Sequence, residues 1–316
     1  MKNTHPLVVL LILLIATASY CQKEQYSALK IPDSLKTNAN AVVREHVIDV
    51  TIASVSSLII QERRVITVLN ELGNRYLNLY KHYDNDSKIN RLSVKIYDAF
   101  GHEIKKISKQ KFIDVSAVEN GTLYSDSRIK YAEYTPTTYP YTVVFESETQ
   151  NSSTGFLTPW YPIENYYISV ENSVYMLTNA ASIPIRVKEE NLEHFSITKH
   201  SKPNTFIYKL TNQVAQKYEQ SSVAFQEIMP HASFALDRFS LNGVLGSASN
   251  WEEFGRWMDT RLLQGRTQLS EATVSEVKNL VKDAKTDIEK AKRIYNFVQN
   301  KTRYIGVQVG IGGWQP

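Results

Sequence analysis

Residues 91–97, RLSVKIY, alternate between polar and apolar side chains, and this period of two is typical of a β-strand with one buried face. Leu92, Val94 and Ile96 would point to one side of such a strand, while polar side chains such as Lys95 would point to the other. The stretch therefore predicts a strand with one side in a core and one side in water.

The same rhythm extends over most of the region from about Asn40 to Leu210, where β-branched and aromatic residues are frequent. Further strands are predicted at 65–69, 75–80, 141–146 and 206–211, with turns at 70–74, 84–86 and 99–101, where Gly or Asn can take positive φ. Many short strands joined by tight turns predict a mainly β domain, and an antiparallel β-sandwich is its natural closure.

After about Asn212 the alternation fades, and Gly243 and Gly246 mark a linker before a helical region. Three short helices are predicted there, because three capping boxes follow in series. They pair Ser249 with Glu252, Thr273 with Glu276, and Thr286 with Glu289. In the last helix the apolar residues follow helical spacing, so we expect that face to pack against other residues. A strand-like run follows at 304–309, before a Gly-rich end.

The composition excludes several classes of protein. The chain has 316 residues, 42% of them hydrophobic, and 36 Lys and Arg against 32 Asp and Glu. This is enough apolar material for a folded core, and the length favours two domains. Because the small positive excess is spread along the chain rather than clustered, we do not expect nucleic acid as a partner.

The N-terminus has the pattern of a secretory signal peptide. Lys2 precedes the apolar run 7–15, and small residues follow at 16–19, so we expect cleavage near Ala18 or Cys21 and a signal peptide of residues 1–21. The run is about half the roughly 20 residues that span a bilayer as a helix, so no transmembrane segment is expected after cleavage. The protein should be exported, periplasmic or extracellular, and soluble or peripheral to the outer membrane.

Metal and cofactor sites are not predicted. Cys21 is the only Cys, and its loss with the signal would remove every thiol. The six His residues after the signal form no His-x-x-x-His pair, and exposed strand or loop imidazoles are their simpler interpretation; they are His46, His82, His102, His194, His200 and His231. A Ser-His-Asp triad stays open, although no Gly-x-Ser-x-Gly elbow is present. Glu146 and Glu148 could be a glycosidase pair or simply a solvated face.

One group of residues could form a binding site. Asp126, Arg128, Tyr139, Tyr141 and Trp160 combine two charges with aromatic faces, and could bind a glycan or protein of the cell envelope. The simpler interpretation is that the two charged residues brace a loop and the aromatic residues fill the rim of the β-domain.

Several stretches resemble a bacterial domain of unknown function that occurs N-terminal to transglutaminase-like domains in exported or envelope proteins. The resemblance covers about Ile31 to Leu210 and rests on residues 31–35, 38–44, 67–70, 96–101, 124–128 and 139–141. A second resemblance, over 249–255, 289–298 and 303–316, is to the connector and the opening of the transglutaminase-like domain itself. It implies a β-domain at 22–245, followed by a mostly helical start of an incomplete α+β domain at 246–316.

The transglutaminase-like superfamily uses a Cys nucleophile with a downstream His and an Asp, and none of these can be placed in this sequence. Cys21 lies in the predicted signal, and no His follows His231. We therefore expect a truncated chain that is catalytically inactive as given, the N-terminal part of a transglutaminase-like or protease-like protein whose β-domain positions substrate or partner. Two alternatives are a stand-alone envelope binding module and an independent enzyme that uses Asp/Glu chemistry.

Overall fold

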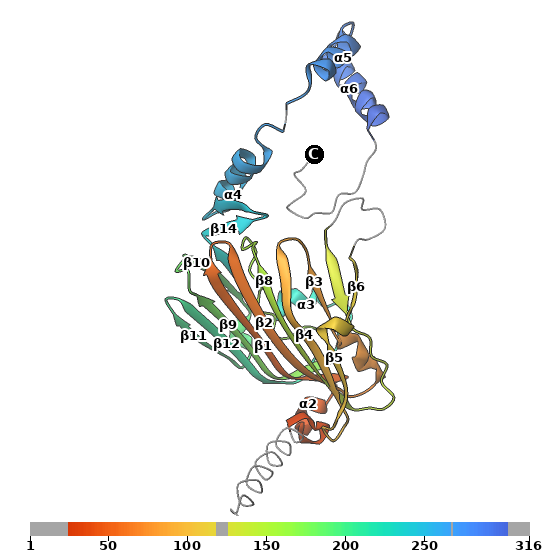
Figure 1. Cartoon of the computed structure of the whole chain (residues 1–316), viewed down its shortest axis with the longest axis vertical. Helices are drawn as coiled ribbons and strands as arrows, with labels where there is room; N and C mark the ends of the chain where they lie inside the picture. Colours follow the sequence, from red (N-terminus) through yellow and green to blue (C-terminus); the bar gives the residue numbers. More distant parts are fainter. Residues whose placement is uncertain (1–24, 118–125, 267, 303–316) are drawn as a thin grey trace, which may run out of the picture. The chain divides into compact units, whose positions relative to one another are not determined.

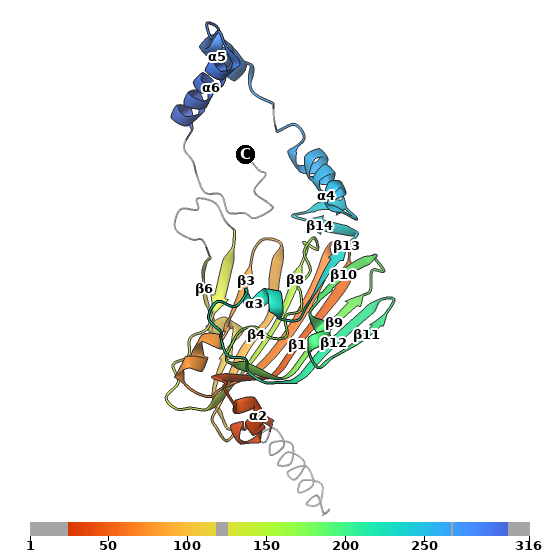
Figure 2. The same ribbon diagram turned by 180° about the vertical axis from the view of Figure 1, so that it is seen from behind.

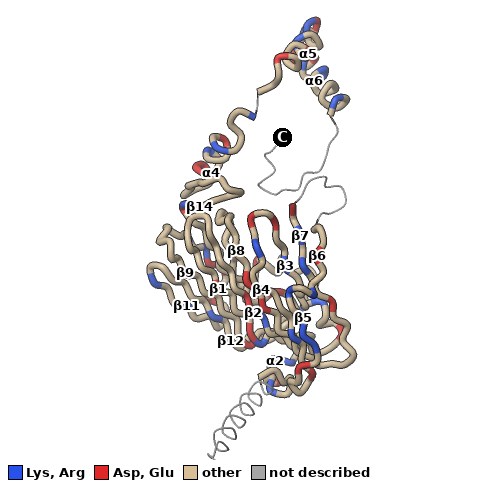
Figure 3. The backbone as a smooth tube through the Cα atoms, viewed as in Figure 1, with Lys and Arg blue, Asp and Glu red and all other residues tan. Residues whose placement is uncertain are grey.

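The computed structural model describes residues 25–117, 126–266 and 268–302. The predicted signal peptide with Cys21 and the strand-like run at 304–309 lie outside these residues. The chain divides into two compact units, Met1–Val115 with Arg128–Leu245, and Ser116–Ser127 with Gly246–Pro316. Both basic and acidic residues occur along the strands of the first unit (Figure 3).

The first unit is built on one large, twisted sheet (Figures 1 and 2). Its eight strands lie in the order β11-β12-β9-β1-β2-β8-β4-β5. In chain order they are β1 (Ala41–Ser54), β2 (Ser57–Val68), β4 (Ser87–Tyr97), β5 (Glu103–Ser108), β8 (Tyr141–Asn151), β9 (Ile168–Asn179), β11 (Ile197–Lys202) and β12 (Thr205–Gln213). Neighbouring strands are antiparallel except β1 and β9, which pair in parallel.

Three small sheets and several short helices complete the strand-rich part. The sheets are β3-β7-β6, with β3 (Tyr80–Tyr83), β6 (Ile113–Ser116) and β7 (Arg128–Tyr131); β10-β13, with β10 (Ile185–Glu190) and β13 (His231–Leu236); and β14-β15, with β14 (Arg238–Leu241) and β15 (Val244–Ser247). The short helices are η1 (Ala28–Lys30), α2 (Asp33–Lys36), η2 (Glu71–Tyr76), η3 (Lys109–Lys111), η4 (Leu192–His194) and α3 (Phe225–Ile228).

The main core lies on one face of the large sheet, which we call the inner face. Leu92, Val94 and Ile96 of β4 are buried there, as their alternation predicts. The core also contains Tyr175 of β9, whose ring stacks on Phe234 of β13 at 5.0 Å between centroids. A mainly β unit with antiparallel strands is thus confirmed. The finer prediction of a two-layer sandwich stays a prediction.

The opposite, outer face of the sheet is mostly polar, but the segment before β1 crosses part of it. Tyr26 packs there with Val65, Tyr97 and Val144 in a small apolar cluster. Its ring lies 4.3 Å from that of Tyr97, centroid to centroid. This crossing segment creates a cavity on a surface that would otherwise be flat.

One predicted strand is wrong. Residues 75–80 were expected to be extended, but Glu71–Tyr76 forms the 3-10 helix η2, and β3 begins only at Tyr80. Gly73 within η2 packs so closely on the chain before β1 that an added Cβ would lie 2.2 Å from the carbonyl oxygen of Asn40. This contact between distant segments has no signature in the local alternation.

The second unit contains α4 (Trp251–Met258), the π-helix η5 (Asp259–Leu263), α5 (Glu271–Val281) and α6 (Asp287–Lys301). The cap of α6 is the predicted one, because Thr286 Oγ1 accepts from the backbone N–H of Glu289. The other two helices begin at different caps from those predicted. Asn250 caps α4 and Ser270 caps α5, because both also have a side-chain oxygen three residues before a free N–H.

The apolar face of α6 does not become buried among the described residues. Ile288 is 83% exposed, Tyr295 63% and Val298 48%. The expectation that this face packs against other residues is therefore wrong for the part of the chain that the structure describes. Within the second unit, α6 packs against α5.

In the described ranges, no helix is both long and apolar enough to cross a membrane.

Candidate functional site

Two of the aromatic residues predicted to bind ligand are core residues. Trp160 is fully buried, and its indole N–H donates to Ser173 Oγ at 3.1 Å. Its ring lies 5.5 Å from that of Tyr208, centroid to centroid. Tyr141 is only 1% exposed. Neither ring offers an open face to a ligand, because both lie inside the sheet's core, so the surface role expected for them is corrected.

Tyr139 lies beside Tyr141 and remains partly open. Asn74 joins the two, since its Nδ2 donates to Tyr139 Oη and its Oδ1 accepts from Tyr141 Oη, both at 2.6 Å. Tyr139 is 36% exposed. Burial, with the neighbouring Tyr139 and Tyr134 adding to it, raises the pKa of Tyr141 well above its usual range. Through these hydrogen bonds, Asn74 of η2 links Tyr139 to Tyr141 of β8.

Arg128 braces a small sheet. Its Nη2 lies 3.0 Å from Asp114 Oδ1, and its Nε donates to Tyr83 Oη at 2.9 Å. Lys130 also bonds Asp114 at 2.6 Å. Hydrogen bonds from Lys130, Tyr83 and Arg128 lower the pKa of Asp114 to about 2. Asp126 falls in the segment assigned to the other compact unit. A binding role for Asp126, Arg128 and Tyr139 stays a prediction.

The suggested carboxylate pair on β8 is part of a polar surface. Glu148 accepts from Gln61 Nε2 at 3.1 Å and from Asn90 Nδ2 at 3.3 Å. Glu146 lies 3.9 Å from Arg63 Nε and accepts from Ser93 Oγ at 3.5 Å. These contacts favour the interpretation as a solvated face of the sheet.

The sequence interpretation missed a cluster of charged side chains on the inner face. We call it the His46 cluster, and it consists of His46, Glu62, Arg64, Lys81 and Glu164. His46 on β1 lies directly opposite Arg64 on β2 in the antiparallel register. It was interpreted as an exposed imidazole, but it is buried. The available signal was its inward position in the alternation that continues through Ile48, Val50 and Ile52.

Each basic group in the His46 cluster has an acidic partner. The His46 ring lies between two carboxylates, with Nε2 at 3.2 Å from Glu62 and Nδ1 at 3.6 Å from Glu164. Lys81 bonds Glu62 at 2.8 Å, and Arg64 bonds Glu164 at 2.7 Å. Two carboxylates, of Glu62 and Glu164, therefore face two cations, of Lys81 and Arg64, around the imidazole ring.

Hydrogen bonding outweighs burial at Glu62. Burial alone would raise the pKa of this carboxyl, but the hydrogen bond from His46 and the charge of Lys81 hold it far below its usual range. Arg64 Nη1 also donates to the carbonyl of Tyr76 at 2.8 Å. The cluster thus ties β1, β2, β3 and the segment before β9 together through ionised groups.

The contacts of the His46 ring are with carboxylates. No Ser, Thr or Cys donates to or accepts from the His46 ring in the hydrogen bonds of the described residues. Across those same residues, no group of three His, Cys, Asp or Glu side chains is placed to hold a metal ion.

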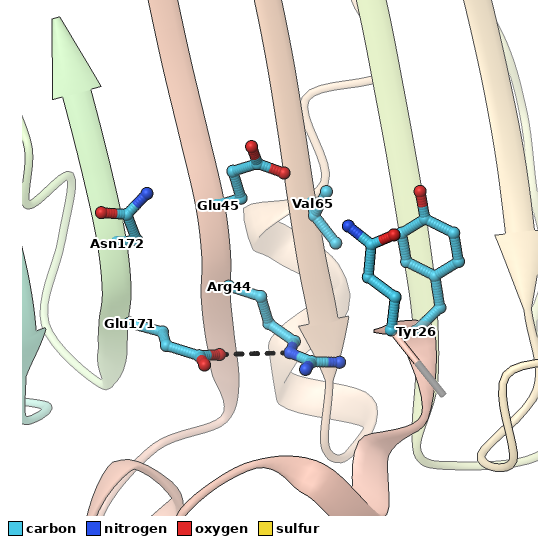
Figure 4. Close-up of a pocket in the computed structure, with 7 residues that line it drawn as sticks. Tyr26, Arg44, Glu45, Val65, Glu171 and Asn172 are labelled. Atoms are coloured by element: carbon cyan, nitrogen blue, oxygen red, sulfur yellow. Dashed lines mark hydrogen bonds and ion pairs between the residues drawn. The ribbon is translucent and has the colours of Figure 1, made fainter. Parts of the chain in front are cut away.

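A second site lies on the outer face, and we call it the outer-face pocket (Figure 4). Its volume is about 240 Å³, and its walls are Gln25, Tyr26, Arg44, Glu45, Val65, Glu171 and Asn172. Arg44 occupies the irregularity in β1 where the register shifts between Val43 and Glu45. Two neighbouring charged residues of the strand can therefore both reach the same pocket.

Arg44 is the most buried charge of the outer-face pocket, with 11% of its side chain exposed. Its Nε donates to Glu171 at 3.2 Å and its Nη1 to the carbonyl of Ser27 at 3.1 Å. Beside the pocket, Arg63 donates to Tyr26 Oη at 2.9 Å. These bonds fix the crossing segment to the sheet and give the pocket its shape.

The sequence matches the model of a known family over more than half of the chain. The family described as "Domain of Unknown Function with solved-structure structure (DUF3857)" matches residues 56–217. The chain therefore belongs to the DUF3857 family, and the predicted domain of unknown function is confirmed over that range. No curated protein matches the sequence.

A solved structure shares the fold of this chain. A protein from Parabacteroides distasonis, described as a "putative protease", is similar with a TM-score of 0.60 and 12% identity, over 87% of this chain and 53% of that chain. The chain thus spans about half the length of that protein. At this identity the likeness shows the fold alone.

Two further matches are weaker. Yeast LTA4 hydrolase in complex with bestatin has a TM-score of 0.28 and 10% identity, over 64% of this chain and 30% of that chain. The M1 zinc metallopeptidase from Deinococcus radiodurans has a TM-score of 0.29 and 9% identity, over 77% and 53%. At these scores neither bears on the function of this chain.

Proposed function

We propose that this chain is the N-terminal part of an exported protein of the transglutaminase-like or protease-like class, and that its β-domain positions a substrate or partner without catalysing a reaction. The observation that carries the proposal is the likeness to the Parabacteroides protein, which extends over 87% of this chain but 53% of that one. A shared fold does not establish shared chemistry, so the role is assigned by the residues.

The residues favour positioning over catalysis. Thiol chemistry would depend on Cys21, the only Cys of the sequence, within the predicted signal. The His46 cluster holds its imidazole between two carboxylates that already have cationic partners. Such a network stabilises and orients segments, and it offers no activated nucleophile.

A turnover experiment tests this proposal. The purified chain is incubated with casein and dansylcadaverine to detect amide-bond transfer, and separately with fluorescein-labelled casein to detect cleavage. We expect no incorporation and no cleavage above buffer. Turnover that is retained after repurification and lost in a His46→Gln variant would overturn the non-catalytic role.

Export is part of the same proposal. The signal pattern of residues 1–21 supports it, and the mature protein would then be periplasmic or extracellular. We expect the chain in the periplasmic fraction of a Gram-negative host, with a new N-terminus near Ala18 or Cys21 by Edman sequencing. An intact Met1 on protein confined to the cytoplasm would contradict export.

The second candidate is a stand-alone binding module for an envelope glycan or protein. The outer-face pocket favours it, because its seven wall residues all come from the first compact unit. Binding without the helical unit would support this alternative, and a requirement for that unit would count against it.

A further inference from the structure

We propose that one end of the large sheet lies on the surface of a lipid bilayer and contacts it through a row of exposed apolar side chains. We call it the lower end. It is the end at which β1 begins, next to α2 at the bottom of Figure 1. The proposal rests on the export proposed above and names a surface that the exported protein would meet, but the binding itself is measured without any turnover.

The strand register brings segments that are distant in the sequence to the lower end. The pairs that fix this end join the first or last residues of neighbouring strands; they are Ala41 with Val68, Val68 with Tyr141, Ala41 with Ile168, and Tyr97 with Glu103. Strand β12 ends at Gln213, which lies opposite Val170 near the start of β9. The connections that precede or follow these residues therefore lie along one end of the sheet.

Several of these connections present an apolar side chain to solvent. Leu72 follows β2, Phe100 lies between β4 and β5, and Val214 follows β12, and all three are exposed. Tyr139, which precedes β8, is partly exposed. Single exposed apolar residues are ordinary on a protein surface, but a group of them along one end of a sheet indicates an interaction surface.

The segment before β1 adds an apolar side chain close to the turn that carries Phe100. The backbone N–H of Ala28 donates to the carbonyl of Ala99 at 2.9 Å, and Ser27 Oγ donates to the same oxygen at 3.2 Å. Leu29 and Phe100 are the next residues of the two joined segments, and both are exposed. The fold thus places two apolar residues from distant parts of the sequence at the same point of the lower end.

The turn that carries Phe100 is fixed by hydrogen bonds. Asp98 Oδ1 accepts from the backbone N–H groups of Phe100 and His102, both at 2.9 Å, and Asp98 Oδ2 lies 3.0 Å from His102 Nδ1. Gly101 has a φ of 86°, in the left-handed region that suits glycine. Because the turn is already ordered, burying the Phe100 ring in a partner would cost less conformational entropy than ordering a mobile loop.

The charges of the lower end do not form a basic patch. Lys36 pairs with Asp33 at 2.9 Å, and His102 pairs with Asp98 at 3.0 Å. Figure 3 shows both signs of charge around α2. Apolar burial rather than attraction to anionic lipids would therefore supply the binding energy, and the strength of such interfacial binding scales with the apolar area buried.

The position of the N-terminal segment favours a bilayer as the partner. Gln25 is the first described residue, and η1 follows it at the lower end. During export the apolar run 7–15 of the predicted signal would lie in the membrane. A spacer of about ten extended residues reaches at most roughly 35 Å, so export would bring the lower end to the bilayer surface.

Flotation with phosphatidylcholine vesicles tests the proposal. The protein is taken from the periplasmic fraction, and its N-terminus is read by Edman sequencing. We expect it to float with the vesicles at low and at high salt, because an apolar contact is not screened by ions. Phe100→Ser should lower the partition coefficient about tenfold, because one ring no longer leaves water, and it should leave the melting temperature unchanged.

Phe156→Ser is the matched control. Phe156 is 62% exposed, against 63% for Phe100, but it lies at the opposite end of the sheet. Its neighbour Thr154 donates to the carbonyl of Val55, in the turn between β1 and β2. We expect Phe156→Ser to bind as the unchanged chain does. All three proteins carry the same N-terminus, so any contribution of the first residues to binding cancels in the comparison.

Three results would overturn the proposal directly. They are no flotation, flotation only with phosphatidylglycerol vesicles that is lost at high salt, and the same partition coefficient for Phe100→Ser and Phe156→Ser. Sedimentation equilibrium without vesicles tests a second copy of the chain as the partner. A dimer that is lost in Phe100→Ser, together with no vesicle binding, would assign the lower end to self-association and also overturn the lipid contact.

The two proposals fail in different ways. Casein turnover by the chain would overturn the non-catalytic role and leave vesicle binding untouched. An intact Met1 on protein confined to the cytoplasm would contradict export, and with it the biological role of the lower end. Loss of vesicle binding by an exported protein would overturn only the assignment of the lower end.

Discussion

Glu62 shows how one half-buried side chain depends on its neighbours. Its folded-state pKa lies below the usual value of 4.5, because His46 and Lys81 outweigh the effect of burial. A lowered folded-state pKa stabilises the protein fully above pH 4.5, and this stability is lost as the pH falls below that value. The cluster therefore makes the fold sensitive to acid.

For Glu62→Gln we expect a loss on the order of 3 kcal/mol at neutral pH, because removing one partner leaves charges uncompensated. The free energy of unfolding should also fall less steeply below pH 4.5 than in the unchanged chain. Urea unfolding at a series of pH values measures both effects. A variant with the same stability and the same acid profile as the unchanged chain would contradict this view, and Glu148→Gln is the control.

Trp160 packs in the core, although the sequence analysis placed it among the candidate binding residues. Trp160→Ala should destabilise the protein by about 3–5 kcal/mol, because a fully buried ring leaves a cavity and Ser173 loses its donor. Thermal and urea unfolding measure this. Tyr139→Ala, at a partly exposed site in the same group of predicted residues, should cost less. A stable Trp160→Ala variant would show that the ring is not part of the core.

At the scale of elements, we expect opposite effects on stability when two glycines are replaced by alanine. Gly73→Ala places a Cβ against the backbone of Asn40 and should destabilise the protein by about 1–3 kcal/mol. In α4 an added Cβ at Gly255 meets nothing within 4 Å, so Gly255→Ala should stabilise that helix by about 0.5–1 kcal/mol. Differential scanning calorimetry of both variants checks this, and equal shifts of the same sign would contradict it.

Comparison of the elements with their predictions shows where the local sequence pattern is sufficient to predict secondary structure. Strand β4 follows its alternation, because Leu92, Val94 and Ile96 are all buried in the core on the same face. The strand predicted at 75–80 does not form over that whole stretch: Glu71–Tyr76 is a 3-10 helix, and Gly73 in it packs closely against the carbonyl of Asn40. The presence of a capping residue before each helix was predicted. However, Asn250 caps α4 and Ser270 caps α5 in place of the predicted Ser249 and Thr273.

At the scale of the whole molecule, the exposed apolar side of α6 is expected to lower solubility. Ile288, Tyr295 and Val298 together form an apolar face in water, and such faces promote association. A chain that ends at Leu245 should therefore be more soluble than the full chain. Light scattering at matched concentrations measures this, and equal solubility would count against the prediction.

The sequence by itself determined the mainly β character, the change to helices near residue 250 and the family, because alternation, capping and local motifs are properties of neighbouring residues. Only the tertiary structure decided the burial of Trp160 and Tyr141, the pairing of Arg128 with Asp114, the His46 cluster and the outer-face pocket. Each of these depends on strand register and on segments far apart in the chain, such as Arg44 and Glu171. Contacts at that separation are set by the packing of the whole sheet.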